Sequence, residues 1–197
     1  MTRPSRDQDT VQLDARNLRG LAHPVRVRLL GLLRTEGSST ATRLGRRLDL
    51  SSAATSYHLR QLADYGFVVE DRDAQRSHGR ERWWRAGARS TSLSTVPEDP
   101  EAKAFAEEYL RAIAGRLAEK VVDWLDEMSA APPEWQRAGS LNDTQCRLTA
   151  DEAEELNRRI GELVEQARRL DPGRRGPRGS QPVSVQWQVL PRLGRRA

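Results

Sequence analysis

Residues 40–70, TATRLGRRLDLSSAATSYHLRQLADYGFVVE, decide the fold of this 197-residue chain. Thr40 is placed to cap a first short amphipathic helix. A tight turn follows at residues 49–51, and a second helix runs from Ser52 towards Gly66, a residue type that often ends helices in the left-handed conformation. Two short helices joined by such a turn predict a helix-turn-helix.

The flanking segments complete a known order of elements. Before the pair, residues 14–21 and 24–37 each predict a helix, the second from apolar residues spaced three to four apart. After it, FVVEDR (67–72) and ERWWRA (81–86) have the composition of strands, and the polar residues 73–80 between them predict a hairpin tip. Helix, helix, turn, helix and hairpin is the order of a winged helix-turn-helix.

The second half of the chain predicts further helices. Apolar residues step by three or four from Phe105 to Met128, and Thr149 and Glu152 form a capping box before a second such stretch. Near the C-terminus, VSVQWQVLP (183–191) alternates like a half-buried strand. The fold class expected is mainly α with a small β-hairpin wing, C-terminal helices and a terminal strand. We divide the chain into a disordered arm (1–13), a winged helix-turn-helix (14–92), a linker (93–100) and a helical dimerisation or effector region (101–197).

Charge is distributed unevenly along the chain, whose net charge is +5. Residues 1–92 hold 17 Arg and 10 acids (+7), residues 93–171 hold 10 Lys or Arg and 18 acids (−8), and residues 172–197 hold six Arg and no acid (+6). A basic first half favours contact with a polyanion. The alternative explanation is an Arg-rich composition inherited from a GC-rich genome.

Composition and motifs argue against several other classes of protein. Cys146 is the single cysteine, so neither a disulfide nor a multi-cysteine zinc site forms within one chain. The first 13 residues lack the apolar core of a signal peptide, and no run approaches the ~18 apolar residues that span a membrane. Common catalytic motifs are absent. We expect a cytoplasmic protein without membrane association, catalytic residues or enzyme activity.

The second helix of the pair carries residue types suited to DNA. Small and hydroxylic side chains let a helix backbone sit deep in a major groove about 12 Å wide, where hydroxyls bond base edges and phosphates. Arg residues at the tip of a wing are suited to the minor groove, where the potential is most negative. The predicted DNA-contacting residues are Thr40, Ser51, Ser52, Thr55, Ser56, Tyr57, Arg60, Arg76 and Arg80, with Arg43, Arg46 and Arg47 near flanking phosphates.

Together, several of these stretches resemble one family. LAHPVRVRLLGLL (21–33), the tetrad Ser56–Tyr57–His58–Leu59, GFVVEDR (66–72) and RERWWRA (80–86) are similar to the ArsR-type winged helix-turn-helix regulators of bacteria. The resemblance covers residues 14–92 and implies a homodimer whose two recognition helices bind an inverted repeat, often as a repressor released by an inducer. The metal-sensing branch of the family uses a Cys pair on a DNA-binding helix, or His and Asp clusters at the dimer interface. This chain lacks the Cys pair, and His23, His58 and His78 are scattered along it, so we predict no metal and no cofactor, with a His and carboxylate site as the open alternative.

The helical second half is expected to form the dimer. The seam residues predicted for dimerisation are Phe105, Tyr109, Ile113, Leu156, Ile160 and Leu163. Heptad spacing does not decide whether these helices pair within one chain or between two. The predicted partners are therefore double-stranded DNA, a second copy of the chain and an unidentified small-molecule effector. The competing hypothesis is an adaptor that keeps the winged fold for protein contacts without specific DNA binding.

Overall fold

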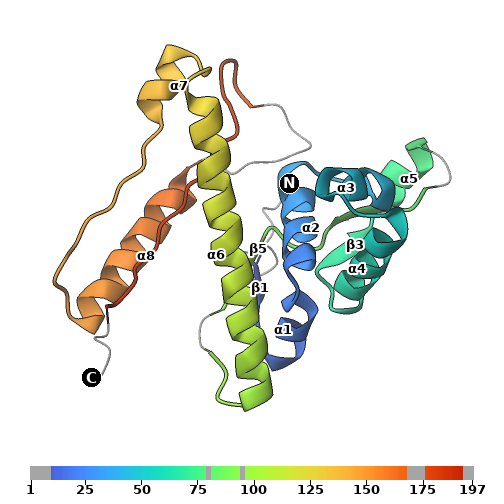
Figure 1. Ribbon diagram of the computed structural model, residues 1–197, viewed down its shortest axis with the longest axis horizontal. Helices are drawn as coiled ribbons and strands as arrows, with labels where there is room; N and C mark the ends of the chain where they lie inside the picture. The colour runs from blue at the N-terminus through green and yellow to red at the C-terminus, as the bar shows by residue number, and fades with distance from the viewer. Residues whose placement is uncertain (1–9, 79–80, 94–95, 168–175, 193–197) are drawn as a thin grey trace, which may run out of the picture. The chain divides into compact units, whose positions relative to one another are not determined.

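A computed structural model describes residues 10–78, 81–93, 96–167 and 176–192. The chain is mainly helical, with a small antiparallel sheet beside the helix-turn-helix, which confirms the predicted fold class (Figure 1). It divides into two compact units, residues 1–120 and 121–197. The boundary falls inside α6 (Pro100–Met128), so most of this long helix belongs to the first unit.

The helix-turn-helix consists of α3 (Ala41–Leu48) and α4 (Ser52–Asp64). Helix α3 begins at the predicted cap, where the Thr40 hydroxyl accepts from the backbone N of Arg43 at 3.4 Å. Helix α4 begins at Ser51, which was predicted only as part of the turn and whose hydroxyl accepts from the backbone N of Ala54 at 3.1 Å. Asp49 ends α3 in the left-handed conformation, at φ 55°. Since Asp tolerates that conformation better than most residues, this turn is encoded locally.

A close approach holds α3 against α4. A Cβ atom at Gly45 would lie 2.7 Å from the carbonyl oxygen of Leu50 and 2.9 Å from Oγ1 of Thr55. The Thr55 side chain is fully buried, and its hydroxyl donates to the carbonyl oxygen of Ser51 at 2.9 Å. The contact therefore requires glycine on α3 and a small, internally bonded residue on α4.

Two helices precede this pair, as predicted. Helix α1 (Ala15–Leu21) starts with a capping box between Asp14 and Asn17. Helix α2 (Pro24–Thr35) has proline at its first position, and Nδ1 of His23 accepts from the backbone N of Val25 at 3.2 Å. These caps satisfy helix amides that would otherwise lack partners.

Three short strands form the wing sheet: β2 (Ser39–Thr40), β3 (Val68–Glu70) and β4 (Trp83–Ala86). All pairs are antiparallel, in the order β2-β4-β3, and Val68 pairs with Ala86. The two predicted strands of the wing are thus confirmed, while β2 was not predicted.

The connection between β3 and β4 differs from the hairpin tip that the sequence predicts. Residues 72–78 form a helix, α5 (Arg72–His78). Its cause is Asp71, whose Oδ1 accepts from the backbone N atoms of Asp73 and Ala74 at 3.2 and 3.1 Å, as a helix N-cap does. The prediction gave weight to polarity and to Gly79 and missed the cap.

The prediction of a disordered arm over 1–13 is wrong for residues 10–13. Residues of β1 (Thr10–Gln12) pair in parallel with β5 (Ser90–Ser92), and Leu13 is 9% exposed. Backbone pairing and burial of Leu13 offset the entropy of ordering this segment. Residues 1–9 lie outside the described part of the chain.

The core of the first unit gathers side chains from α1, α2, α3, α4 and α6. Leu18, Leu29, Leu59 and Leu62 are fully buried, together with Phe67 next to β3. The first part of α6 belongs to the same core, where Ala106 and Tyr109 are buried. The fold of the first unit therefore extends well past residue 92, where the sequence places the end of the winged domain.

The second unit contains the end of α6, α7 (Pro133–Ala138) and α8 (Ala150–Gln166). The predicted capping box of α8 is confirmed by mutual bonds between Thr149 and Glu152. The predicted terminal strand is wrong, because residues 183–191 form no ladder and Nε1 of Trp187 instead donates to Oδ1 of Asn157 at 2.9 Å. Alternating apolar residues without a partner strand do not make a sheet.

Candidate nucleic-acid interface

The exposed edge of α4 carries most of the predicted contact residues. Ser51, Ser52 and Arg60 are exposed, and Tyr57 is 55% exposed, while Ser56 is half-buried. The hydroxyl of Ser51 is also occupied by the α4 cap. This edge therefore presents hydroxyl, phenol and guanidinium groups on one recognition-type helix.

Two of the predicted contact residues do not reach the surface. Thr40 is 1% exposed and Thr55 is 0% exposed. Both hydroxyls serve the fold, one as the cap of α3 and the other in the contact with Gly45. Their assignment to DNA contact is therefore corrected, because a fully buried hydroxyl has no access to a base or phosphate.

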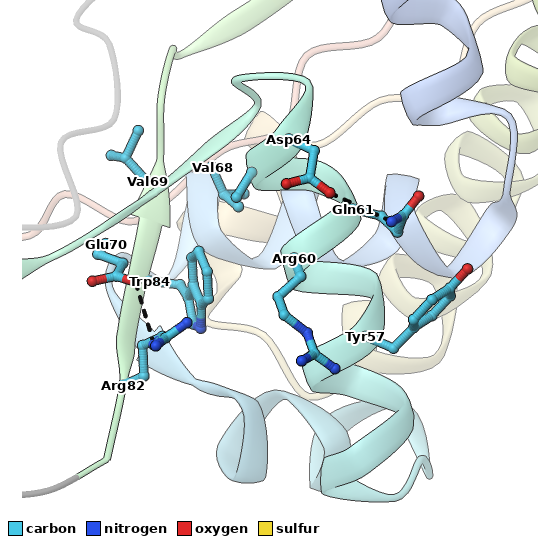
Figure 2. Close-up of a pocket in the computed structure, with 10 residues that line it drawn as sticks. Tyr57, Arg60, Gln61, Asp64, Val68, Val69, Glu70, Arg82 and Trp84 are labelled. Atoms are coloured by element: carbon cyan, nitrogen blue, oxygen red, sulfur yellow. Dashed lines mark hydrogen bonds and ion pairs between the residues drawn. The ribbon is translucent and has the colours of Figure 1, made fainter.

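An open concavity of about 670 Å³ lies between α4 and the wing sheet. Figure 2 shows Arg60 and Tyr57 on the α4 side, with Arg82 and Trp84 on the opposite side. Nε of Arg82 lies 3.3 Å from Oε1 of Glu70, and its guanidinium lies 5.8 Å from the centre of the Trp84 ring. Two exposed guanidinium groups therefore face one hollow, which suits a polyanion.

Sequence reasoning did not select Arg82. Arg82 lies just before β4, inside the strand that the sequence predicts over residues 81–86. Only the pairing of β4 with β3 places it beside Glu70 and opposite α4. The available hint was its position next to the two tryptophans, because a guanidinium stacks well on an aromatic ring.

The wing helix presents Arg76 to solvent. Its side chain is 81% exposed and lies 3.7 Å from the carboxylate of Asp73. An ion pair this exposed contributes little to stability, so the guanidinium exchanges it readily for another anion. Arg80, the second predicted wing contact, lies outside the described residues.

Three arginines of α3 were predicted to lie near flanking phosphates. The guanidinium of Arg43 lies 4.8 Å from the ring centre of Trp83, and Arg47 forms a 2.8 Å ion pair with Glu36. Arg46 is exposed on the same helix. All three are at the surface, where backbone phosphate contact is sterically open.

A histidine pair lies behind the exposed edge of α4. The ring centres of His23 and His58 are 4.6 Å apart, and within the described part of the chain the buried Nδ1 of His58 has no hydrogen-bond partner. Burial, followed by the nearby His23 and Arg26, lowers the pKa of His58 below its ordinary value. The neutral imidazole is therefore the form that this packing favours.

The residues predicted for dimerisation fall into two sets. On α6, Tyr109 is buried in the core of its own chain, its hydroxyl 3.0 Å from that of Thr91, and Phe105 and Ile113 pack against the same core. On α8, Leu156 is 39% exposed and Leu163 is 67% exposed, while Ile160 is half-buried. Only the α8 set leaves large apolar surface uncovered.

The described residues contain no group of three or more His, Cys, Asp and Glu side chains arranged to hold a metal ion. No described helix combines the length and apolar character needed to cross a bilayer.

The fold and its exposed α4 edge define a winged helix-turn-helix DNA-binding domain. Residues 21–71 match a family model described as a helix-turn-helix domain. The HTH-type transcriptional regulator YgaV of Escherichia coli (strain K12) is 36% identical over 76 residues, which cover 39% of this chain and 77% of that protein. The solved structure of a Lactococcus lactis ZitR mutant in apo form shares 18% identity over 77% of this chain and 85% of that chain, with a TM-score of 0.30.

The identity and coverage shared with YgaV place this chain in a family. It belongs to the HTH-type transcriptional regulators of the ArsR type, as its sequence motifs predict. This is a family of regulators and not of enzymes. The shared 76 residues amount to 39% of this chain, so the relationship with YgaV covers less than half of it.

Proposed function

We propose that this regulator acts as a homodimer that represses transcription from an inverted-repeat operator in the bacterial cytoplasm. In this proposal each copy inserts α4 into a major groove, and the two grooves lie about one helical turn apart. Its DNA-contacting residues are Ser51, Ser52, Ser56, Tyr57 and Arg60.

The exposed edge of α4 is the observation that carries the proposal. Ser52 at its first turn is small, so the helix backbone can approach base edges closely. Tyr57 and Arg60 lie one and two turns further on, and no acid occurs from Ser51 to Gln61. A helix edge of small, hydroxylic and cationic side chains fits the floor of a major groove better than it fits a protein surface.

The wing supplies contacts beside the groove. Arg76 on α5 and the sequence-predicted Arg80 are proposed to lie along the minor groove or the phosphate backbone. We add Arg82, because it faces the same concavity as Arg60 and is oriented by Glu70. Each phosphate that these residues neutralise adds about one unit to the salt dependence of binding.

The proposed dimer uses the apolar positions of α8, namely the exposed Leu156 and Leu163 and the half-buried Ile160 between them. Their spacing of four and three residues is that of a helix-pairing seam. Phe105, Tyr109 and Ile113 contribute indirectly, because they fix the first part of α6 on the winged domain.

A gel-shift titration tests this function. The full-length protein is titrated onto a labelled fragment of its own upstream region at two salt concentrations, with excess random competitor DNA. Complex that survives the competitor, with two chains per site, is the expected result. Binding abolished by the competitor would reduce the protein to non-specific charge attraction, and no binding at low salt would favour a protein-binding adaptor.

A further inference from the structure

Arg34, at the end of α2, carries a positive charge that its surroundings do little to neutralise. Its Nε donates to the carbonyl oxygen of Ala88 at 3.0 Å, and its buried Nη2 has no hydrogen-bond partner among the described residues. The pKa of Arg34 is lowered to about 10, chiefly by burial; Tyr109 opposes this shift, and the neighbouring Arg116 adds a smaller lowering effect. Among the described residues, no acid is in a position to neutralise Arg34.

A second guanidinium, that of Arg116 on α6, reaches the same region. Its Nη1 donates to the carbonyl oxygen of Val27 at 3.2 Å. The group occupies the space that Gly31 leaves open, since a Cβ atom at residue 31 would lie 1.1 Å from Nη1 of Arg116. Glycine at this position of α2 thus lets a cation from another helix approach Arg34.

The surroundings are short of negative charge. Glu119 is the acid that favours the charged form of Arg116, and its carboxylate is also 3.5 Å from Arg28. Glu119 is thus the one described acid that acts electrostatically on either Arg34 or Arg116.

We propose that Arg34 and Arg116 bind an oxyanion, a carboxylate or phosphate group, between α2 and α6. A buried cation is costly unless it is paired, and a guanidinium pairs best with a planar or tetrahedral oxyanion through two parallel hydrogen bonds. Such a group bridging the two guanidinium groups would relieve their mutual repulsion and give Nη2 of Arg34 an acceptor. This inference stands apart from the proposed DNA contacts and does not depend on them.

Two sources supply that chemistry: a free small-molecule anion, or a carboxylate of a second copy of the chain. In either case the site joins α6 to α2, and Leu29 and Leu33 of α2 share a core with Leu59 of α4. An anion that tightens this joint would stabilise one arrangement of the recognition helix, which is how an effector acts on a two-state regulator.

Thermal unfolding with inorganic phosphate tests the site. The melting temperature of the full chain is measured in sodium phosphate and in sodium chloride of equal ionic strength. Ligand linkage predicts a rise of about 5–10 °C at a phosphate concentration about 100 times its Kd. The rise should be lost in Arg34→Gln and in Arg116→Gln, and should persist in the matched control Arg111→Gln, an exposed arginine of the same helix.

Further variants separate the site from general salt effects. Phosphate stabilises many proteins by exclusion from their surface, an effect that all variants share. Glu119→Gln removes the described acid that competes for Arg116, so it should increase phosphate affinity. If the two Gln variants fold poorly, Glu119→Gln still tests the proposal.

Repeating the chloride measurement at several protein concentrations distinguishes the two sources. A phosphate response that is independent of protein concentration indicates a free anion. Stability that rises with protein concentration in the wild type and in Arg111→Gln, but not in Arg116→Gln, indicates a carboxylate of a second copy. An equal phosphate response in wild type and Arg116→Gln, with no such concentration dependence, would overturn the proposal.

Discussion

Gly45→Ala probes the contact on which the recognition helix rests. The new methyl group would lie 2.7 Å from the carbonyl oxygen of Leu50 and 2.9 Å from Oγ1 of Thr55. Neither atom is the end of a flexible side chain, so α3 must move away from α4. Overpacking of this kind costs about 1–3 kcal/mol, against a gain of about 1 kcal/mol from the better helix propensity of alanine. We expect a net loss of up to about 2 kcal/mol.

The matched control is Gly115→Ala on α6, where nothing lies within 4 Å of the added Cβ. Here only helix propensity changes, so stability should rise by about 0.5–1 kcal/mol. Urea unfolding measures both variants, and the midpoints should move in opposite directions with an unchanged slope. DNA affinity should fall for Gly45→Ala alone. Equal stability of the two variants would refute the close contact between α3 and α4.

Three further perturbations test separate parts of the chain. Asp71→Ala should lower stability at pH 7 by about 0.5–2 kcal/mol, because alanine cannot cap α5. Hydrogen bonding lowers the pKa of the Asp71 carboxyl, so urea unfolding should show the difference shrinking as pH falls below 3.8 through the folded-state pKa. Because the pKa of His58 is lowered in the folded chain, the unfolded chain takes up the proton first as pH falls. Stability should therefore fall as pH drops below 6.5, and it should fall less steeply in His58→Gln. Equal slopes of stability against pH in the two proteins would contradict the packing described. Leu163→Glu should shift sedimentation towards the monomer, whereas the similarly exposed Leu141→Glu should not.

The helix-turn-helix was predictable because its determinants are local. The determinants are the caps Thr40 and Ser51 and the turn at Asp49, each of which acts within a few residues. The Thr40 cap and the turn are as predicted, and Ser51 caps α4 at the position where the sequence places the end of the turn. The wing strands followed from composition in the same way. The cap of α5 at Asp71 was equally local, and it was missed because the polar composition of residues 73–80 favoured a hairpin tip.

The remaining differences depend on contacts between distant residues. Strand β1 exists because residues 10–12 find a partner at 90–92, and the apolar alternation at 183–191 finds none. The candidate site shows the same division. The pattern of residues along one helix does not reveal that Thr55 of α4 is buried against Gly45 of α3. Sequence alone also does not place Arg82 across a concavity from Arg60.

The most direct test of the account is a comparison of Arg60→Gln with wild type on two DNAs. Binding to the protein's own upstream fragment and to random DNA is measured at one salt concentration, with Arg111→Gln as the control. If Arg60 contacts a base edge, specific affinity should fall by about 1–3 kcal/mol, roughly 5- to 150-fold, while binding to random DNA changes much less. An equal loss on both DNAs, or no loss on either, would contradict recognition by the exposed edge of α4.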